Sequence, residues 1–280
     1  NRVFDSREAL VAGVREIAAT IAAKSPLSIR GTKEMITYAR EHSVADGLNY
    51  IATWNAYRLG VQEYVMQFML CTPPELSPKM DLAKALAKWE MVRPLVEESE
   101  RRGSPFRIYK MIRTGLLSYK TDTDLSKGQL TASMFYGAFL QPDIVHVVAY
   151  CEAIRRATSV EILESVKMVK QAINMAYRGL PDLSADSELE ARKDLLIAEA
   201  SVILDAIRKL DRTIEDPLST PEILEQAILT GILDAPGLSK GPAKADVKTG
   251  IVNGANESLD ENGSVLPEKD RIGRLGARLV

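Results

Sequence analysis

A proline-rich stretch at residues 71–78 constrains the fold of this chain more than any other feature. It reads Cys-Thr-Pro-Pro-Glu-Leu-Ser-Pro. Proline has no backbone N–H donor and pushes the residue before it out of the helical region, so we expect no helix to cross this stretch. The sequence therefore predicts three parts: a helical segment at 1–71, a helical and α/β region at 72–243, and an irregular tail at 244–280.

The segment before the prolines is expected to form three helices. The first two begin near Asp5 and Ser25, where capping patterns stand. Ser43 with Asp46 forms another capping box. It opens a third helix, expected at 44–70, because apolar residues recur there at helical spacing. Such a stripe indicates a core or a subunit interface.

The longer region after the prolines is expected to be mainly helical. Helices are predicted at about 80–101, 106–117, 125–140, 159–179, 186–211 and 220–233. One buried strand is expected at 144–150, because its β-branched, apolar residues are typical of a parallel strand covered on both faces. In the tail, short strands are expected at 247–252 and 264–266, with a hairpin turn at Asn262-Gly263. Residues 271–280 are expected to be frayed.

The predicted fold class is mostly α with a minor α/β portion. It comprises an N-terminal three-helix segment, an incomplete barrel-like βα region and a short β-hairpin-like tail. A full barrel is not expected, because one strand is predicted where eight are needed.

Composition and charge exclude several classes of function. The net charge is -2, and no basic run carries interleaved aromatic residues, so nucleic acid is not an expected partner. No apolar run approaches the roughly 18 residues of a membrane span, so no membrane is expected. The two cysteines, Cys71 and Cys151, fit the cytoplasm or another reducing compartment and are expected to be buried. The histidines and cysteines have no metal-ligand spacing, so no metal site is predicted.

Three carboxylates near the predicted strand are the polar residues most worth testing. They are Asp143, Glu152 and Glu161. Glu152 falls just past the carboxyl end of the strand, which is the end that carries the chemistry in barrels and open α/β sheets. The alternative interpretation, which the residues alone favour, is a solvated carboxylate at a helix start, where it suits the helix dipole. His146 lies within the apolar strand and is expected to be a core histidine.

Residues 2–70 resemble the C-terminal tail of the dienoyl-CoA isomerases, in the crotonase (enoyl-CoA hydratase) family. The residues in register with that tail are Lys24-Ser25-Pro26, Thr32-Lys33, Tyr38-Ala39-Arg40, His42-Ser43-Val44 and Leu48-Asn49-Tyr50 through Trp54-Asn55. The resemblance implies a tail that packs helices over a catalytic core and builds an oligomer. It implies acyl-CoA as the ligand and no cofactor. It also implies that the acidic residues and the oxyanion-hole amides lie upstream of the tail, so this segment alone should not catalyse.

Residues 82–265 resemble the C-terminal part of the glutamate (methylaspartate) mutase large subunit. The resemblance rests on the segments 152–175, 179–181 and 231–236. It implies a (β/α)₈ barrel and radical carbon-skeleton chemistry with adenosylcobalamin, which a small partner subunit binds. Glu152 matches an acidic residue that meets the adenosyl ribose. The family's nearby lysine falls at Val148, and the cobalamin motif D-x-H-x-x-G is absent from the sequence.

These observations leave three hypotheses for the function. The first is a fragment-like or non-catalytic relative of an adenosylcobalamin-dependent mutase large subunit with a crotonase-like helical segment. It has Glu152 as a cofactor-binding residue and no catalytic residue. The second is a crotonase-family dienoyl-CoA isomerase or enoyl-CoA hydratase, seen only through its oligomerising tail. The third is a non-enzymatic helical assembly module, or a chimeric or designed chain. An enzyme would be an isomerase, and a homo-oligomer or the small cobalamin-binding subunit is the expected partner.

Overall fold

The computed structural model describes residues 6, 45–179, 182, 185–235 and 246–278. The chain divides into two compact units, Asn1–Glu41 and His42–Val280, and the second contains nearly all described residues. The helices expected near Asp5 and Ser25 lie outside the described residues. None of the helices within the described ranges is both long enough and apolar enough to cross a membrane.

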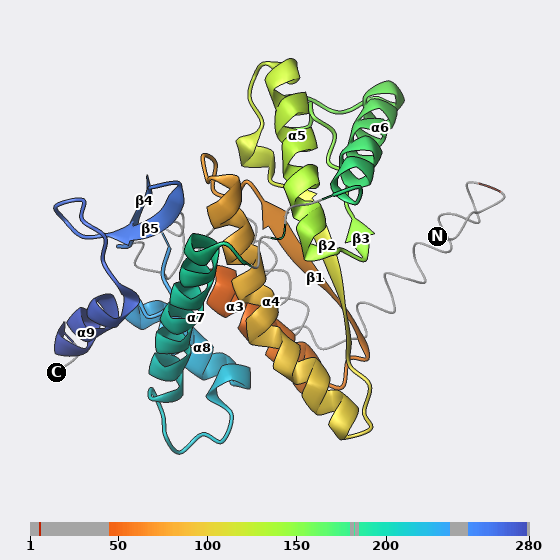
Figure 1. The fold of residues 1–280 in the computed structure, drawn as a ribbon. Coiled ribbons are helices and arrows are strands. Elements are labelled where there is room, and N and C mark those ends of the chain that lie inside the picture. The colour runs from red at the N-terminus through yellow and green to blue at the C-terminus, as the bar shows by residue number, and fades with distance from the viewer. Residues whose placement is uncertain (1–5, 7–44, 180–181, 183–184, 236–245, 279–280) are drawn as a thin grey trace. The chain divides into compact units, whose positions relative to one another are not determined.

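The centre of the second unit is a small parallel sheet (Figure 1). Its strands are β1 (Glu63–Leu70), β2 (Arg107–Thr114) and β3 (Ile144–Val145), in the order β1-β2-β3. The helix α4 (Pro78–Arg101) connects β1 to β2, and α5 (Thr123–Gly137) lies between β2 and β3. The segment β1–α4–β2–α5–β3 therefore consists of two successive βαβ units.

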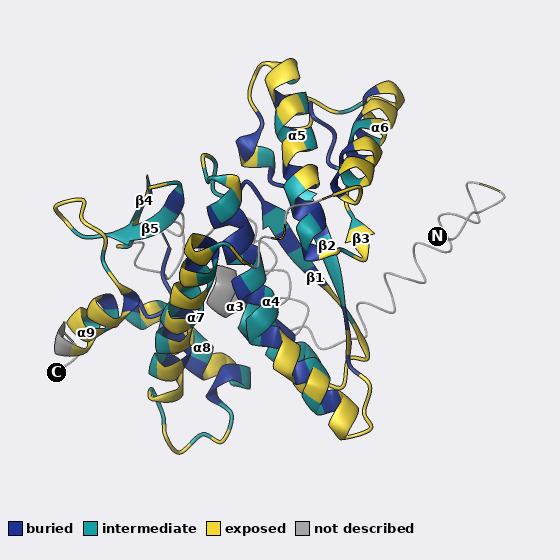
Figure 2. Cartoon of the chain, viewed as in Figure 1, coloured by how far each residue is buried: buried dark blue, intermediate teal, exposed yellow. Residues whose placement is uncertain are grey.

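The sheet has one buried face and one open face. Met66, Phe68 and Leu70 of β1 are buried on this face, and so are Ile108, Ile112 and Thr114 of β2, of which Ile112 and Thr114 pair with Phe68 and Leu70. Helix α5 packs on this face, since a Cβ built on Gly137 would lie 2.4 Å from Cδ1 of Leu70. The intervening residues are exposed or half-buried and form the open face: Val65, Gln67, Met69, Tyr109, Met111 and Arg113 (Figure 2).

The remaining helices pack around these βα units. They are α3 (Ala45–Arg58), α6 (Ser159–Ala176), α7 (Ser187–Arg208), α8 (Pro221–Thr230) and α9 (Glu268–Arg278). Short 3-10 turns cover Leu116–Ser118, Ala138–Leu140 and Pro217–Ser219. Helix α6 packs on α5, and α7 packs on α4 and α9. These contacts gather one apolar core, which includes Phe68, Leu82, Ile112, Leu130 and Leu189.

The helix expected at 44–70 is wrong in its second half. Helix α3 ends at Arg58, where Gly60 takes a left-handed φ of 75° and the backbone N–H of Val61 donates to the carbonyl of Ala56. These are the features of a Schellman cap, which stops a helix. The following residues form β1, because pairing along the whole of β2 satisfies their backbone groups.

The helix expected at 106–117 is also wrong, because this segment is strand β2. Ile108 and Ile112 stand four residues apart, a spacing that fits both a helix face and a strand face. Met111 strengthened the helical pattern, although it lies on the open face of the sheet. The segment forms a strand and not a helix because it pairs with β1, which is distant in the sequence.

The strand expected at 144–150 is shorter than predicted. Regular pairing covers Ile144 and Val145, and the N–H of His146 then donates to the carbonyl of Ile112 at 2.9 Å. Ile144 and His146 are exposed, so the strand is not covered on both faces. Val148 to Cys151 are buried but irregular.

The hairpin in the tail uses a different turn from the one expected. Strand β4 (Lys248–Val252) pairs with β5 (Ala255–Leu259) through Asn253 and Gly254, which both have positive φ, at 51° and 75°. Two such residues make the turn that matches strand twist. The Asn262-Gly263 pair lies in the next turn, which brings 264–266 back alongside β5. The residues from Arg271 to Arg278, which were expected to be frayed, belong to α9.

The prolines at 71–78 end β1 and begin α4 without separating two cores. Ser77 caps α4, and its side chain accepts from the N–H of Met80 at 3.2 Å. Strand β1 before the prolines and strand β2 after them pair along their full length. Residues 63–70, which belong to the predicted first part, therefore share the core of the predicted second part.

Candidate functional site

The carboxyl edge of the parallel sheet gathers polar side chains from all three strands and both crossover helices. Cys71 and Thr72 follow β1, Arg113 and Thr114 end β2, and His146 follows β3. This is the edge at which open α/β sheets and barrels bind ligands. Its buried side and its open side have different chemistry.

On the buried side, Asp81 holds the end of β1. The backbone N–H of Cys71, which has a left-handed φ of 57°, donates to Oδ2 of Asp81 at 2.6 Å. Lys84 pairs with Oδ1 of Asp81 at 2.6 Å and donates to the carbonyl of Thr72. One carboxylate at the start of α4 thereby fixes the backbone that leaves β1.

The thiol of Cys71 belongs to the same network. The hydroxyl of Tyr136 donates to Oδ2 of Asp81 at 2.7 Å, so its oxygen is left to accept from the Cys71 thiol 3.1 Å away. The amide of Gln129 donates to Sγ at 2.8 Å. Burial, and then the charge of Asp81, raise the pKa of Cys71. Because the thiolate is the nucleophile, Cys71 is a protected structural residue.

Close packing between β1 and β2 completes the buried side. A Cβ built on Gly115 would lie 1.8 Å from Oγ1 of Thr72 and 3.2 Å from the carbonyl oxygen of Leu70. The hydroxyl groups of Thr114 and Ser133 lie 2.7 Å apart and join β2 to α5. The backbone at this edge is therefore closely packed.

On the open side, Arg113 and His146 are neighbours on adjacent strands. Met111 pairs with Ile144 and Ile112 with Val145, and the His146 N–H bond to Ile112 continues this register. Arg113 and His146 therefore project from the same face. Met69, the partner of Arg113 on β1, lies on its other side.

Glu152 stands near this row, in a turn seven residues after β3. Its Oε1 accepts from the backbone N–H of Ala149 at 2.9 Å, and the residue is exposed. Partial desolvation, and then the charge of Arg113, lower the pKa of His146, whereas the charge of Glu152 opposes this shift. His146 is therefore mainly neutral at pH 7, when its imidazole can accept a proton.

The nearby tyrosine is not a free acid or base. The hydroxyl of Tyr119 donates to the carbonyl of Val148 at 2.9 Å. Burial raises the pKa of Tyr119 well above its usual range. Tyr119 therefore positions the segment between β3 and Glu152.

The other two carboxylates singled out in the sequence have structural partners. Asp143 accepts from the backbone N–H of Lys110 at 2.8 Å, next to the start of β3. Glu161 forms a capping box with Thr158 at the start of α6 and pairs with Arg155. His146, expected in the core, is exposed, and Cys151 is buried as expected. In the described part of the chain, no three His, Cys, Asp or Glu side chains gather into a metal-binding group.

Sequence reasoning missed Arg113, Asp81 and Tyr136. Arg113 was assigned to a helix, so its place at a strand end was hidden. Asp81 lies in the first turn of α4, where a carboxylate is ordinarily read as a partner of the helix dipole. No local pattern in the sequence shows that Asp81 accepts from the backbone N–H of Cys71, ten residues earlier.

Comparison with curated proteins finds a partial similarity to the Delta(3,5)-Delta(2,4)-dienoyl-CoA isomerases. A stretch of 72 residues is 39% identical to the mitochondrial protein of Homo sapiens, covering 26% of this chain and 22% of that protein. A stretch of 59 residues is 48% identical to the peroxisomal protein of Arabidopsis thaliana, covering 21% of each. The match to the human protein thus covers about a fifth of that protein's length. No protein-family model matches the chain.

This similarity agrees with the resemblance of residues 2–70 to dienoyl-CoA isomerases, which is of nearly the same length. The comparisons give no support to the mutase resemblance of residues 82–265. That resemblance stays a prediction, and so does the cobalamin cofactor that it implies.

Proposed function

We propose that this chain is an isomerase that acts on a CoA thioester by proton transfer. The observation that carries this proposal is the partial identity with dienoyl-CoA isomerases of human and plant origin. The second of the three hypotheses from the sequence is thereby preferred to the first.

The chemistry named by those relatives sets what a site must supply. Moving two double bonds from positions 3 and 5 to positions 2 and 4 removes a proton from C2 and adds one at C6. The thioester carbonyl becomes an enolate in between, so a site needs proton carriers and a stabiliser of the oxyanion.

The open side of the sheet edge offers groups of these kinds. Glu152 and neutral His146 can each accept and return a proton, and the guanidinium of Arg113 can stabilise a developing oxyanion. We assign Glu152 the role of base at C2. The proton that it takes passes to neutral His146, and the imidazolium then delivers this proton to C6. Arg113 stabilises the enolate in between. The register of β2 and β3 supports this grouping, because it sets Arg113 and His146 side by side.

The test is turnover of a 3,5-dienoyl-CoA, followed by the absorbance of its 2,4-dienoyl product. We expect Glu152→Gln and His146→Gln each to lower kcat by about 100-fold or more, the usual contribution of a general acid or base. Glu225→Gln, an exposed change on α8, is the matched control and should leave kcat unchanged.

Two results would count against this proposal in different ways. Unchanged turnover in both variants would place the chemistry outside the sheet edge. A chain that neither turns over the substrate nor binds an acyl-CoA in calorimetry would remove the isomerase function altogether, and would favour the assembly module.

A second candidate is a carbon-skeleton mutase subunit, which one observation favours. The two successive βαβ units form a short run of parallel strands, as in part of a barrel. The residues present do not fit the cofactor well. Val148, where the mutase family has a lysine, is buried, and Oε1 of Glu152 is already bonded to the N–H of Ala149. Conversion of glutamate to methylaspartate only on addition of adenosylcobalamin and a cobalamin-binding subunit would establish this alternative.

A further inference from the structure

The C-terminal segment 246–278 is attached to the rest of its unit by charged and backbone groups more than by an apolar core. It contains the β4–β5 hairpin and α9, and we call it the C-terminal strap. Its buried residues are Ala255, Glu268 and Arg271, so two of the three are charged. No residue of the strap, which is described throughout, belongs to the apolar core that joins the sheet to α4, α5 and α7. A segment attached in this way can open while the core stays folded.

Backbone hydrogen bonds attach the strap at its first residues and at its hairpin turn. The buried carboxylate of Asp234 accepts from the N–H groups of Asp246 and Val247 at 2.8 and 3.3 Å. The N–H of Ser77, which caps α4, donates to the carbonyl of Gly254 at 2.9 Å. The hairpin turn therefore rests on the start of α4, the helix whose Asp81 holds the end of β1.

Ion pairs attach the rest of the strap. Nη1 of Arg192 on α7 pairs with Oε1 of Glu257 on β5 at 2.6 Å, and Nη2 donates to the carbonyl of Asn256 at 3.1 Å. The side chains of Arg192 and Glu257 are only 9% and 15% exposed. On α9, Arg271 pairs with Glu268 at 2.7 Å. Ion pairs that are this well shielded are costly to break when one partner is lost.

A third carboxylate, that of Glu199, faces these pairs from α7. Glu199 is half-buried and follows Arg192 by seven residues, about two turns, so both lie on one face of the helix. Burial, and then the charge of Glu268 on α9, raise the pKa of Glu199, and the charge of Glu257 on β5 adds to this rise. A hydrogen bond with the backbone of Glu268 and the charge of Arg192 oppose it.

The charges of this cluster do not balance when every group is ionised. Three carboxylates, those of Glu199, Glu257 and Glu268, stand against the two guanidinium groups of Arg192 and Arg271. One negative charge is therefore in excess between α7 and the strap. Protonation of Glu199 removes this excess and leaves both ion pairs intact.

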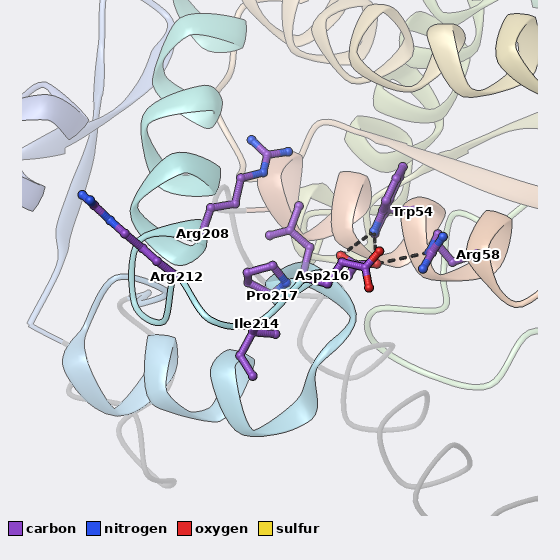
Figure 3. Close-up of a pocket in the computed structure, with 9 residues that line it drawn as sticks. Trp54, Arg58, Arg208, Arg212, Ile214, Asp216 and Pro217 are labelled. Atoms are coloured by element: carbon purple, nitrogen blue, oxygen red, sulfur yellow. Dashed lines mark hydrogen bonds and ion pairs between the residues drawn. The ribbon is translucent and has the colours of Figure 1, made fainter.

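Helix α7 belongs to the core side of this contact. It packs on α4, and its residue Leu189 lies in the apolar core. The segment after α7 is attached to α3, because Nε1 of Trp54 donates to both carboxylate oxygens of Asp216 at 3.1 and 3.2 Å, and Arg58 pairs with the same group (Figure 3). If the contact opens, the strap is therefore the part that moves.

We propose that the C-terminal strap is a pH-sensitive device, which closes on α7 when Glu199 is protonated and loosens when Glu199 is ionised. Closure raises the pKa of Glu199, so the closed strap binds this proton more tightly than the open strap. Closure is therefore favoured most below the ordinary pKa of a glutamate, and this contribution is lost as the pH rises through the raised pKa. Opening would free the N–H of Ser77 at the start of α4. The inference does not depend on the proposed isomerase function.

Hydrogen exchange of the whole chain tests this device, with each rate corrected for the intrinsic effect of pH on exchange. We expect the opening equilibrium of the strap amides to increase about threefold or more between about pH 5 and pH 8. Glu199→Gln keeps the shape of the side chain but removes its charge. This variant should keep the strap closed, with an opening equilibrium that does not change over the same range.

Two further variants and an internal reference make the test specific. Asp194→Asn, on the same helix, is the control, because its side chain is 72% exposed, and it should keep the pH dependence of the natural chain. Arg192→Gln should open the strap at every pH, because it leaves Glu257 without its donor. The amides of β1 and β2 should stay protected in all variants, which shows that the core is folded.

Three results would overturn the proposal. The first is strap exchange that does not change with pH in the natural chain. The second is the same pH dependence in Glu199→Gln as in the natural chain. The third is an equal loss of protection in β1, β2 and the strap, which would mean that the strap does not open separately from the core.

Discussion

The hydroxyl of Tyr136 on α5 donates to Oδ2 of Asp81 on α4 at 2.7 Å, and this bond joins the two crossover helices at the end of β1. The same carboxylate accepts from the backbone of Cys71 and pairs with Lys84. A single buried acid thus satisfies a tyrosine, a lysine and a strained backbone. Such networks are stable when every member is satisfied and costly when one is removed.

Removing the Tyr136 hydroxyl should therefore destabilise the protein. We expect Tyr136→Phe to lower the free energy of unfolding by about 1–3 kcal/mol, because it leaves the Cys71 thiol without its acceptor and Asp81 with one donor fewer. Urea unfolding measures the change. Tyr177→Phe is the matched control, because Tyr177 is 58% exposed. Equal stabilities of the two variants would show that the network contributes nothing.

The packing of Gly115 against Thr72 gives a second prediction. Gly115→Ala should destabilise the fold, since the added Cβ would meet Oγ1 of Thr72 at 1.8 Å. Thr72→Ala should recover part of the loss in the double variant, by a coupling energy of about 0.5–3 kcal/mol. Gly128→Ala in α5 is the control, because nothing lies within 4 Å of its added Cβ. That change should stabilise by up to about 1 kcal/mol. Additive effects of the first two substitutions would contradict the contact.

Helix boundaries and sheet strands differ in how far the sequence reveals them. The predicted helices at 80–101, 159–179 and 186–211 correspond to α4, α6 and α7, because their caps and apolar stripes are local signals. Strand β2 was missed, because Ile108 and Ile112 satisfy both periods. Strand β1 was missed, because its apolar residues follow those of α3 and only Gly60 marks the break. Both strands are specified by pairing across more than 40 positions.

The candidate site also combines residues that local sequence patterns reveal with residues that only long-range pairing brings together. Glu152 could be singled out from the sequence because it follows a recognisable strand. Its grouping with Arg113 depends on the register of β2 against β3, which no local pattern contains. The contact between Trp54 and Asp216 was not foreseen either, because the two residues lie 162 positions apart in the chain.

The docking of α9 depends on one buried arginine. Nη1 and Nη2 of Arg271 donate to the carbonyls of Gly231 and Ile232 at 2.7 and 2.8 Å, and Nε donates to Glu268 at 2.7 Å. Arg271→Ala should lower the free energy of unfolding by about 3–5 kcal/mol, because it leaves the buried carboxylate of Glu268 and two backbone carbonyl groups without their hydrogen-bond donor.

Hydrogen exchange would localise the effect of Arg271→Ala. The amides of α9 and the end of α8 should lose protection first, since they lose direct contacts. Arg274→Ala, an exposed change on the same helix, should alter neither stability nor exchange. Uniform loss of protection across the sheet would instead mean that α9 does not open separately.

The start of α6 should make stability depend on pH in the acid range. The hydrogen bond from Arg155, followed by the backbone N–H of Thr158, lowers the pKa of Glu161 to about 2. The unfolded chain therefore binds more protons than the folded chain between about pH 4.5 and pH 2, so this stabilisation is present above that window and is lost as the pH falls through it. In Glu161→Gln the free energy of unfolding should fall less steeply with decreasing pH, as measured by urea unfolding between about pH 5 and pH 3. Glu222→Gln, an exposed first-turn change on α8, should leave the decline unaltered.

Two substitutions on the open side of the sheet edge should shift the pKa of His146 in opposite directions. Arg113 lowers the pKa of His146 and Glu152 raises it. Arg113→Gln should therefore raise that pKa, and Glu152→Gln should lower it further. Nuclear magnetic resonance titration in a His42→Gln background leaves one histidine signal to follow. Shifts of these signs would place both side chains within electrostatic range of the imidazole in solution, as a shared proton-transfer site requires. An unchanged titration in both variants would separate the three residues and remove the basis for assigning them to one site.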